Sequence, residues 1–406
     1  MVSDAIDAWL EAARDEQLIL LQALVRTPSD NPPGDLAAAG EACAVALEAL
    51  GLAVERHPVP SELCRQHGMV SATNLVVRER FGDGPTIALN AHGDVVPPGD
   101  GWTRSPYGGD VIDGWLYGRG AAVSKSDIAS YAFALLAIRT SGRINRGSVE
   151  LHITWDEEAG GEIGPARLLA ERLTAPDLCI AAGFPYTVVT AHNGCLHLEV
   201  EIRGRSAHAA KPWTGVDALE ATSHLLQALY ASRPALAATT STIAGIGSPQ
   251  LTIGLIEGGI NTNVVPDRVT LRLDRRLVPE EDAGAVDAAL RTLIDEAVAK
   301  VPGASAEVRR LLLAEPLRET AASRQLAEAL AAQATAVLGE PVGVGGVPLY
   351  TDARHYAAAG VPTVLFGAGP RTIEEANAHR ADERVPVREL HAATVVIART
   401  LLQVLG

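Results

Sequence analysis

The sequence of 406 residues predicts an α/β protein in which a smaller α+β domain is inserted into a larger one. Helical and strand patterns alternate along the first part of the chain, which is typical of a sheet covered by helices on both faces. From about residue 194 the pattern becomes mainly strands, and after residue 302 it returns to long helix and short buried strand. We therefore expect a large domain formed by residues 1–193 and 303–406, with an inserted domain at 194–302.

The elements of the large domain follow from hydrophobic periodicity and turn residues. Residues 1–24 have an amphipathic helical period, and Asp35 precedes a second helical pattern as a possible cap. The turn Gly82-Asp83-Gly84 separates two apolar strand patterns. In order, we expect helices at 36–50 and 321–338 and strands at 73–77, 86–90, 148–154 and 363–366.

The inserted segment has its own strand and helix pattern. We expect strands at 196–202, 251–256 and 269–273 and a helix at 218–231. A helix among strands that are close in sequence is typical of an α+β unit with helices on one face of its sheet.

Composition excludes several functional classes. The net charge of −15 would repel a phosphate backbone, and no basic stripe offsets it, so we expect no nucleic-acid partner. No apolar run reaches about 18 residues, and the acidic N-terminal segment does not resemble a signal peptide, so we expect no membrane partner. The four cysteines are scattered without a CxxC pair, which favours reduced thiols and a cytoplasmic location.

Residues able to do chemistry follow three of the predicted strands. His92 and Asp94 come after the strand at 86–90, and Asp156-Glu157-Glu158 come after 148–154. His379 follows the third strand and a glycine-rich turn. Ligands bind at the carboxyl ends of strands in open α/β sheets, so these side chains indicate a site there. A carboxylate beside a histidine commonly fixes the tautomer of the imidazole.

Eight motifs in order resemble the M20 family of metallopeptidases, which includes aminoacylases, carboxypeptidase G, acetylornithine deacetylase and succinyl-diaminopimelate desuccinylase. They cover nearly the whole chain: HGDVVP (92–97), GWTRSPYGG (101–109), DGWLYGRGA (113–121), TWDEEAGG (154–161), GRSAHAAKPWTGVDA (204–218), GGINTNVVPDRVTLRLDRR (258–276), YTDAR (350–354) and AHRADE (378–383). The resemblance implies a zinc-peptidase-like catalytic domain with an inserted lid or dimerisation domain.

The resemblance also implies roles for individual residues. The family's two-zinc site has five ligands, and His92, Glu158 and His379 match three of them. Glu157 matches the general base that activates water, and Asp94 matches the residue that orients the first histidine.

Two of the five family ligands are absent. Val123 stands where the family has a metal-bridging aspartate, and Phe184 stands where it has another carboxylate. Asp127 lies one helical turn beyond Val123, too far along the chain to replace the bridge. Glu158 is then the one remaining ligand carboxylate, which is too little negative charge for two zinc ions. We therefore expect no metal cofactor, with one Zn²⁺ at His92, Glu158 and His379 as the alternative.

These replacements lead to three functional hypotheses. The first is an M20-like enzyme that acts on an amino-acid derivative or small peptide-like amide by metal-independent acid-base chemistry, either hydrolysis or a related condensation, elimination or isomerisation. Glu157 and the His92–Asp94 pair would be catalytic, with Glu158, His379, Val123 and Phe184 lining the substrate. The second is a one-zinc amidohydrolase or peptidase that cleaves N-acyl amino acids or dipeptides. The third is a catalytically silent binding protein.

The inserted domain keeps further family residues. His208 resembles the histidine that reaches a neighbouring active site and polarises the substrate carbonyl, which implies a homodimer. Asn263 and Arg276 resemble groups that hold a substrate carboxylate, and a planar guanidinium suits that role. We therefore expect a small substrate with a carboxylate and an amide. Pocket lining and core packing are both open for three further aromatic or imidazole side chains, Tyr186, His192 and Tyr350.

Overall fold

The structure, a computed structural model, describes residues 2–406. It divides into two compact units, which are described separately. The first unit comprises the chain up to Thr190 together with Glu319–Gly345 and Thr351–Gly406, and the second comprises Ala191–Arg318 and Gly346–Tyr350. The expected α/β class, with a smaller α+β unit inserted into a larger one, is confirmed.

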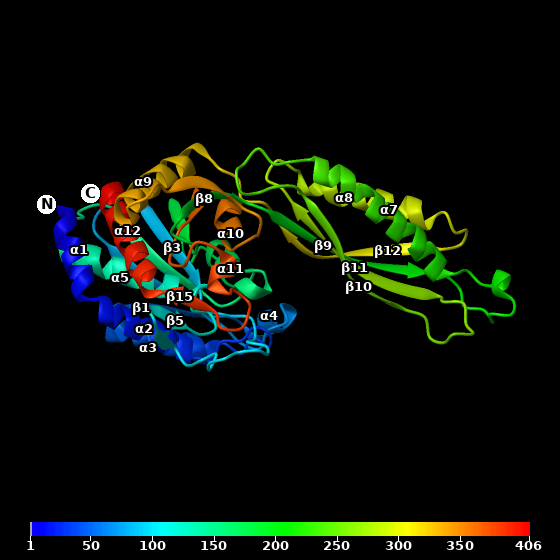
Figure 1. The fold of residues 1–406 in the computed structure, drawn as a ribbon, viewed down its shortest axis with the longest axis horizontal. Helices are drawn as coiled ribbons and strands as arrows, with labels where there is room; N and C mark the ends of the chain where they lie inside the picture. Colours follow the sequence, from blue (N-terminus) through cyan, green and yellow to red (C-terminus); the bar gives the residue numbers. More distant parts are fainter. Residues whose placement is uncertain (1) are drawn as a thin grey trace. The chain divides into compact units, whose positions relative to one another are not determined.

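An eight-stranded sheet runs through the first unit (Figure 1). In sheet order its strands are β1 (Val54–Pro58), β2 (Thr73–Arg80), β6 (Ser148–Thr154), β3 (Thr86–His92), β7 (Leu178–Ala181), β14 (Thr363–Leu365), β8 (Thr187–His192) and β13 (Gly343–Val347). The four strands β6, β3, β7 and β14 are parallel. Their carboxyl ends therefore meet at one edge, where the predicted site residues follow them.

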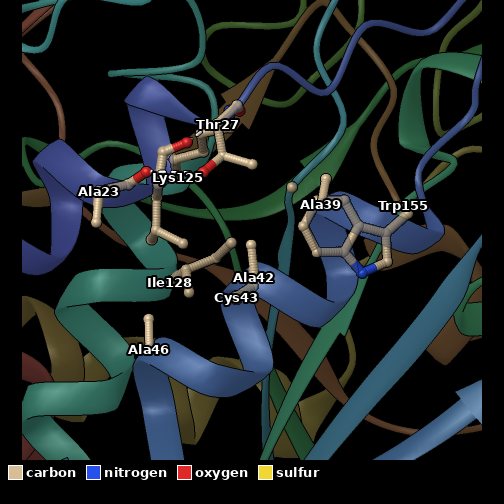
Figure 2. A pocket seen from close by; sticks show the side chains of 11 residues that line it. Ala23, Thr27, Ala39, Ala42, Cys43, Ala46, Lys125, Ile128 and Trp155 are labelled. Atoms are coloured by element: carbon tan, nitrogen blue, oxygen red, sulfur yellow. Dashed lines mark hydrogen bonds between the residues drawn. The ribbon is translucent and has the colours of Figure 1, made fainter. Parts of the chain in front are cut away.

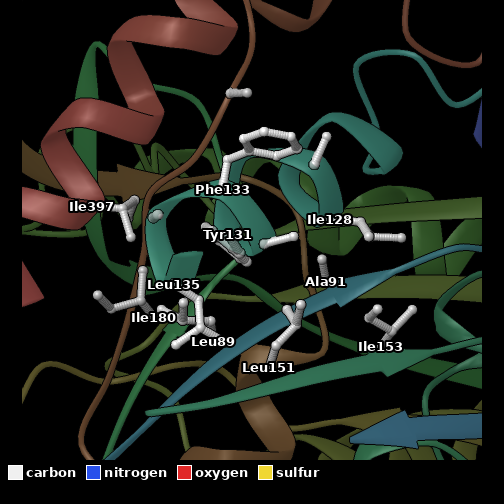
Figure 3. Packing of buried hydrophobic residues seen from close by; sticks show 14 of the residues in the cluster. Leu89, Ala91, Ile128, Tyr131, Phe133, Leu135, Leu151, Ile153, Ile180 and Ile397 are labelled. Atoms are coloured by element: carbon white, nitrogen blue, oxygen red, sulfur yellow. The ribbon is translucent and has the colours of Figure 1, made fainter. Parts of the chain in front are cut away.

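Helix α5 (Lys125–Ser141) is the central helix of the first unit. Every residue from Lys125 to Ile138 is buried, which is typical of a helix enclosed by protein on all sides. Figure 3 shows Leu135 of α5 beside Leu89 of the sheet and Ile128, nearer the start of α5, above Ala91. The start of α5 is thus fixed next to the ends of β3 and β6.

Other helices cover both faces of the sheet. Helices on the α5 side are α1 (Val2–Ala12), α2 (Arg14–Arg26), α3 (Ala37–Ala49), α9 (Ala321–Leu338) and α12 (Val387–Leu405). On the opposite face, α10 (Ala353–Ala358) packs on α6 (Pro165–Ala170). Successive side chains of β6 point to opposite faces of the sheet. Leu151 therefore faces α5, whereas His152 stacks on Tyr356 of α10.

A small sheet holds the AHRADE motif beside the loop that contains GRGA. Its order is β15 (Arg384–Pro386), β5 (Trp115–Tyr117) and β4 (Asp110–Ile112). Because β15 pairs with β5, the residues just before β15 lie beside the loop that follows β5. The remaining short elements of this unit are α4 (Ser61–Gln66), the 3-10 turn η1 (Glu157–Ala159) and α11 (Ile373–Ala376).

The second unit is a four-stranded antiparallel sheet with two helices. The strand order is β10 (Gln250–Gly258), β11 (Arg268–Leu277), β9 (Gly194–Arg203) and β12 (Ser305–Ala314). Helices α7 (Ala218–Ala238) and α8 (Ala283–Val298) pack on it, and the 3-10 turn η2 (Pro212–Thr214) precedes them. Alternate residues of β9 from Leu196 to Ile202 are buried in this helix-covered core.

Several predicted boundaries are corrected by the structure. The second unit continues to Arg318, beyond residue 302, because β12 pairs with β9 along its length. The predicted first helix is divided into α1 and α2 at Ala13. Asp35 does not cap α3, because its carboxylate accepts a hydrogen bond from the Ser71 hydroxyl at 2.6 Å. Within residues 2–406, no helix is both long and apolar enough to cross a membrane.

Candidate active site

The predicted site residues of the first unit gather at the carboxyl edge of its parallel strands. His92 is the last residue of β3, and Glu157 and Glu158 form the 3-10 turn after β6. Phe184 follows β7, and His379 lies between α11 and β15. Donor atoms of His92, Glu157 and Glu158 lie within 4.8 Å of one another.

Asp94 organises the histidine and the two glutamates. Its Oδ1 lies 3.3 Å from His92 Nδ1, and the same nitrogen lies 3.0 Å from the Asp94 carbonyl. The fully buried Asp94 carboxylate also accepts the backbone N–H groups of Glu157 and Glu158, at 3.3 and 3.1 Å, and the Asn31 amide at 3.0 Å. A proton on Nδ1 is therefore held by Asp94, which leaves the lone pair on Nε2 of His92.

Burial and charge shift the proton affinities of this cluster. Burial is the main cause that raises the pKa of Glu157 to about 8; Glu158 and Asp94 add to it, whereas His92 opposes it. Burial alone would disfavour the imidazolium of His92, but the Glu157, Asp94 and Glu158 carboxylates raise its pKa well above the usual range. Glu157 and His92 therefore compete for a proton near neutral pH, and the state in which His92 carries it leaves Glu157 as a carboxylate.

His379 is more exposed than the rest of the cluster. Its Nε2 lies 3.2 Å from Oε1 of Glu158, and its side chain is 53% exposed against 9% for Glu158. Its hydrogen bond with Glu158 is the main cause that raises the pKa of His379. The structure thus links the five polar residues that the sequence predicted for the first unit through direct contacts.

Apolar side chains occupy the two altered ligand positions. Val123 is half-buried and packs against the core, as does Phe184. The Phe184 ring lies so close to Gly369 that a Cβ there would be 2.2 Å from the ring. Neither position presents an oxygen to the cluster, so the donor set does not fit a two-ion centre.

The Asp127 carboxylate binds backbone N–H groups at the ends of two strands and is not part of the cluster of His92, Glu157 and Glu158. Its Oδ1 accepts the Ala368 N–H at 2.6 Å, and the Gly183 N–H also donates to it. A Cβ at Gly367 would lie 1.8 Å from this oxygen, so the close approach requires glycine there. Burial raises the pKa of Asp127 well above its usual range. The residue therefore links the ends of β7 and β14 and does not replace the missing bridge.

Ser124 and Lys125 diverge. The Ser124 hydroxyl is within hydrogen-bonding distance of both backbone groups of His92, accepting from its N–H at 3.0 Å and donating to its carbonyl at 3.1 Å. Lys125 Nζ donates to the carbonyls of Leu24 and Thr27, at 3.0 and 2.9 Å. The Ser124 hydroxyl is thus bound to the backbone of His92, and the Lys125 amine is bound at the end of α2. The two side chains therefore cannot act as a nucleophile and its base.

A cavity of about 210 Å³ lies behind the start of α5 (Figure 2). Figure 2 shows Lys125 at its wall beside Thr27, with Ile128, Cys43 and alanines forming much of the rest. Burial lowers the pKa of Lys125 to about 8 and raises that of Cys43 to about 12. Trp155 also lines the cavity, and a Cβ at Gly93 would lie 2.5 Å from its ring, which explains the glycine between His92 and Asp94.

Asp352, within the YTDAR motif, lies beside the candidate site but was not predicted from the sequence. Asp352 is 5% exposed and accepts the Thr154 hydroxyl at 3.3 Å. Burial is the main cause that raises its pKa to about 8, and the Glu157 carboxylate is the next. Three residues later, His355 Nε2 lies 2.9 Å from the carbonyl of Gly160 and holds the turn that carries Glu157. The position of Asp in that motif was the available signal.

The remaining predicted residues lie mainly in the second unit. His208 is exposed, and its Nδ1 accepts the Ala210 N–H at 3.0 Å. The exposed Asn263 is joined to the same loop through its carbonyl, which accepts the Ala209 N–H at 3.0 Å. Arg276 lies over the ring of Tyr350, 5.6 Å from its centre. His192 is buried, and its Nδ1 lies 2.8 Å from the Asn193 carbonyl. In the first unit, the Tyr186 hydroxyl donates a hydrogen bond to Glu389 at 2.9 Å.

Comparison with known proteins gives consistent matches along the chain. The model of peptidase family M20/M25/M40 matches residues 88–403. The succinyl-diaminopimelate desuccinylase of Gluconacetobacter diazotrophicus is 32% identical over 98% of this chain and 99% of its own length. That of Rhodospirillum rubrum is 31% identical over 95% of this chain and 98% of its own.

Solved structures share the fold at low identity. Human carnosine dipeptidase 1 has a TM-score of 0.75 at 19% identity, covering 99% of this chain and 98% of that one. An M20 family metallo-carboxypeptidase from Sulfolobus solfataricus has a TM-score of 0.76 at 18% identity, covering 95% and 98%. A Bacillus subtilis protein described as a dinuclear metal binding peptidase of the M20 family has a TM-score of 0.71 at 18% identity, covering 97% and 99%.

Proposed function

Because the chain belongs to peptidase family M20/M25/M40, we propose that it is a hydrolase that cleaves the amide bond of an N-acylated amino-acid derivative. The observation that carries this proposal is the position of Glu157. Its backbone is fixed by Asp94, and its carboxylate lies within 4.8 Å of donor atoms of His92 and Glu158. A carboxylate held in this way beside an oriented imidazole can accept a proton from an attacking water.

We propose that this site holds at most one metal ion. Val123 and Phe184 rule out the donor set of a two-ion centre, whereas His92 and Glu158, with His379 in contact with Glu158, have the composition of a two-histidine, one-carboxylate zinc site. An ion held there would polarise the substrate carbonyl and favour ionisation of water. This chain's own contribution is proton transfer at Glu157 and the orientation of His92 by Asp94.

Metal-independent acid-base catalysis is the second candidate. The observation in its favour is that apolar side chains replace two metal ligands while the proton-transfer residues are retained and connected. In that case His92 would donate a proton to the leaving nitrogen after Glu157 takes one from water. Both candidates give Glu157 the same role and differ in their response to metal removal.

We propose a substrate with at least one carboxylate besides the amide. The curated relatives are named for succinyl-diaminopimelate, an acylated amino acid with several carboxylates. Arg276, stacked on Tyr350, and Asn263 are the proposed carboxylate-binding residues. A guanidinium stacked on an aromatic ring keeps its planar edge for two hydrogen bonds to a carboxylate.

A substrate panel with and without metal removal tests the proposal. Purified protein is incubated with N-succinyl and N-acetyl amino acids and with dipeptides, and release of the free amine is measured. Amide cleavage that stops after chelation and returns with one equivalent of zinc supports the one-ion candidate. Cleavage that survives chelation supports the metal-independent one. Binding of these compounds without any cleavage would overturn the proposed hydrolase function and favour a silent binding protein.

A further inference from the structure

A cysteine, a histidine and an aspartate meet on the sheet of the second unit, in a cluster that the proposed hydrolysis does not use. Cys195 and His197 are two residues apart on β9 and therefore point to the same face. On the neighbouring strand β11, Asp274 lies opposite His197 and Arg276 lies opposite Cys195. Leu196 and Leu198, the residues that alternate with them, are buried in the helix-covered core, so the four polar side chains occupy the other face.

Two separations within this cluster are close to those of ligands around one ion. Cys195 Sγ lies 3.6 Å from Oδ1 of Asp274, and His197 Nε2 lies 3.2 Å from its Oδ2. One donor atom from each residue lies within 4.8 Å of the others. Ligands at zinc-like bond lengths in tetrahedral geometry are separated from one another by about 3.3–3.8 Å. Small side-chain rotations would therefore complete the coordination.

We propose that Cys195, His197 and Asp274 form a second metal site, specific for a zinc-type divalent ion and separate from the catalytic cluster. A thiolate, an imidazole and a carboxylate together suit zinc and closely related ions, whereas magnesium and calcium prefer oxygen ligands alone. Three protein ligands leave a fourth position for water or a ligand carboxylate. The inference does not depend on the proposed amide hydrolysis.

Charge and burial favour an ion at this place. The thiolate and carboxylate would offset the two positive charges of zinc, the imidazole would bind as the neutral form, and the Arg276 guanidinium beside Asp274 would leave one positive charge at the site. Arg276 Nε lies 3.1 Å from the Asp274 carboxylate and fixes its orientation from outside the site. Cys195 is fully buried, whereas the His197 and Asp274 side chains are 35% and 28% exposed, which gives an ion a route from solvent.

Cobalt substitution tests the site because it reports a thiolate ligand directly. The catalytic cluster contains no cysteine, so a cobalt–thiolate charge-transfer band in the near ultraviolet can come from the second site but not from the first. We expect the full-length protein, titrated with Co²⁺, to develop this band with one equivalent and to lose it when Zn²⁺ is added. Cys195→Ser should abolish the band, whereas Cys179→Ser, a matched change at another buried cysteine, should retain it.

Two further variants separate this site from the catalytic one. His197→Gln should weaken cobalt binding, measured on the same band, by about 10-fold or more, because it removes a ligand at a half-buried position outside the helix-covered core. Glu158→Gln should leave the band unchanged. Cobalt uptake by the unmodified protein without a thiolate band would overturn the proposal, as would a band that persists in Cys195→Ser; the cluster would then be an ordinary ion-pair network.

Discussion

Arg119 and Glu383 form a buried ion pair with Nη1 and Oε2 2.6 Å apart, and both side chains are only 1% exposed. The other oxygen of Glu383 accepts the backbone N–H groups of Ala122 and Val123, at 3.1 and 3.2 Å. One carboxylate from the last motif of the chain therefore holds the loop that carries Val123. The shape of this side of the site depends on a contact between segments far apart in the sequence.

Replacing Glu383 by Gln should destabilise the protein strongly. The substitution leaves the Arg119 guanidinium buried without a compensating charge, which typically costs about 3–5 kcal/mol. Chemical denaturation of Glu383→Gln measures the change in the free energy of unfolding. Glu62→Gln is the matched control, because Glu62 pairs with Arg65 on the surface with both side chains about two-thirds exposed, and it should change stability by less than about 1 kcal/mol. Similar values for the two variants would contradict a structural role for the buried pair.

Glu157→Gln should reduce turnover by about 10²-fold or more while substrate binding is largely retained, because the amide keeps the size of the side chain but cannot accept a proton. Asp94→Asn should have a smaller effect, which acts through the orientation of His92. Steady-state kinetics on the substrate found in the panel measures both. Glu171→Gln, at an exposed glutamate paired with Arg167, is the control and should be unchanged. Near-normal turnover of Glu157→Gln would place the base elsewhere.

Lys125 should make stability depend on pH in the alkaline range. Its pKa is lowered from 10.5 to about 8 in the folded protein, so between these values the unfolded chain binds more protons than the folded one. Stability contributed by this residue therefore rises with pH across that window, by about 3 kcal/mol in total, and the cost of burying the charged amine is fully present below pH 8.

The Lys125→Met variant isolates this effect. It removes the titrating amine but also leaves the Leu24 and Thr27 carbonyls without their donor, a loss that does not change with pH. The difference in unfolding free energy between the parent and Lys125→Met should therefore grow in favour of the parent from pH 8 to 10. Denaturation curves at several pH values measure it, and a difference that stays constant would show that the amine does not titrate in this range.

Self-association through the second unit remains a prediction from the sequence. The structure supports it because β10 is an edge strand on which Leu255 and Ile256 are 59% and 49% exposed. An exposed apolar edge strand can pair with the same strand of a second copy. We expect a dimer in sedimentation experiments and a monomer for Ile256→Glu, with Ile19→Glu, at an isoleucine of the first unit that is 62% exposed, as the control. A fully active monomer would refute this.

Much of the candidate active site could be predicted because its residues lie at or just after the ends of strands. His92 and Glu157 come immediately after apolar runs whose parallel pairing brings the ends of β3 and β6 together. Local pattern and the rules of α/β sheets were sufficient there. Asp352 was missed because its significance lies in its closeness to Glu157, and nothing in the local sequence records a contact over that separation.

The domain boundary and the proposed metal site of the second unit could not be predicted for the same reason. Strand β12 carries arginines and glutamate among its apolar residues, and it is defined by pairing with β9, which lies about a hundred residues earlier in the chain. Cys195 and Asp274 are likewise brought together by the pairing of β9 and β11. Register between distant strands sets these features, and periodicity within one strand does not encode it.

Restoring carboxylates at Val123 and Phe184 should allow the site to bind an additional metal ion. In the double variant Val123→Asp, Phe184→Glu, two carboxylates return to the ligand cluster and offset the charge that a second ion brings. Made in a Cys195→Ser background, so that the second-unit site takes no ion, this variant should bind about one more equivalent of zinc per chain than its parent. Elemental analysis after dialysis measures the difference.

Val123→Asn with Phe184→Gln is the matched control, because it restores polarity without charge and should gain no ion. Added zinc should also raise the melting temperature of the carboxylate variant more than that of the control, since binding to the folded state alone contributes about 2.7 kcal/mol at a hundred times Kd. An unchanged zinc content in the carboxylate variant would mean that Val123 and Phe184 are not what limits this site to one ion at most.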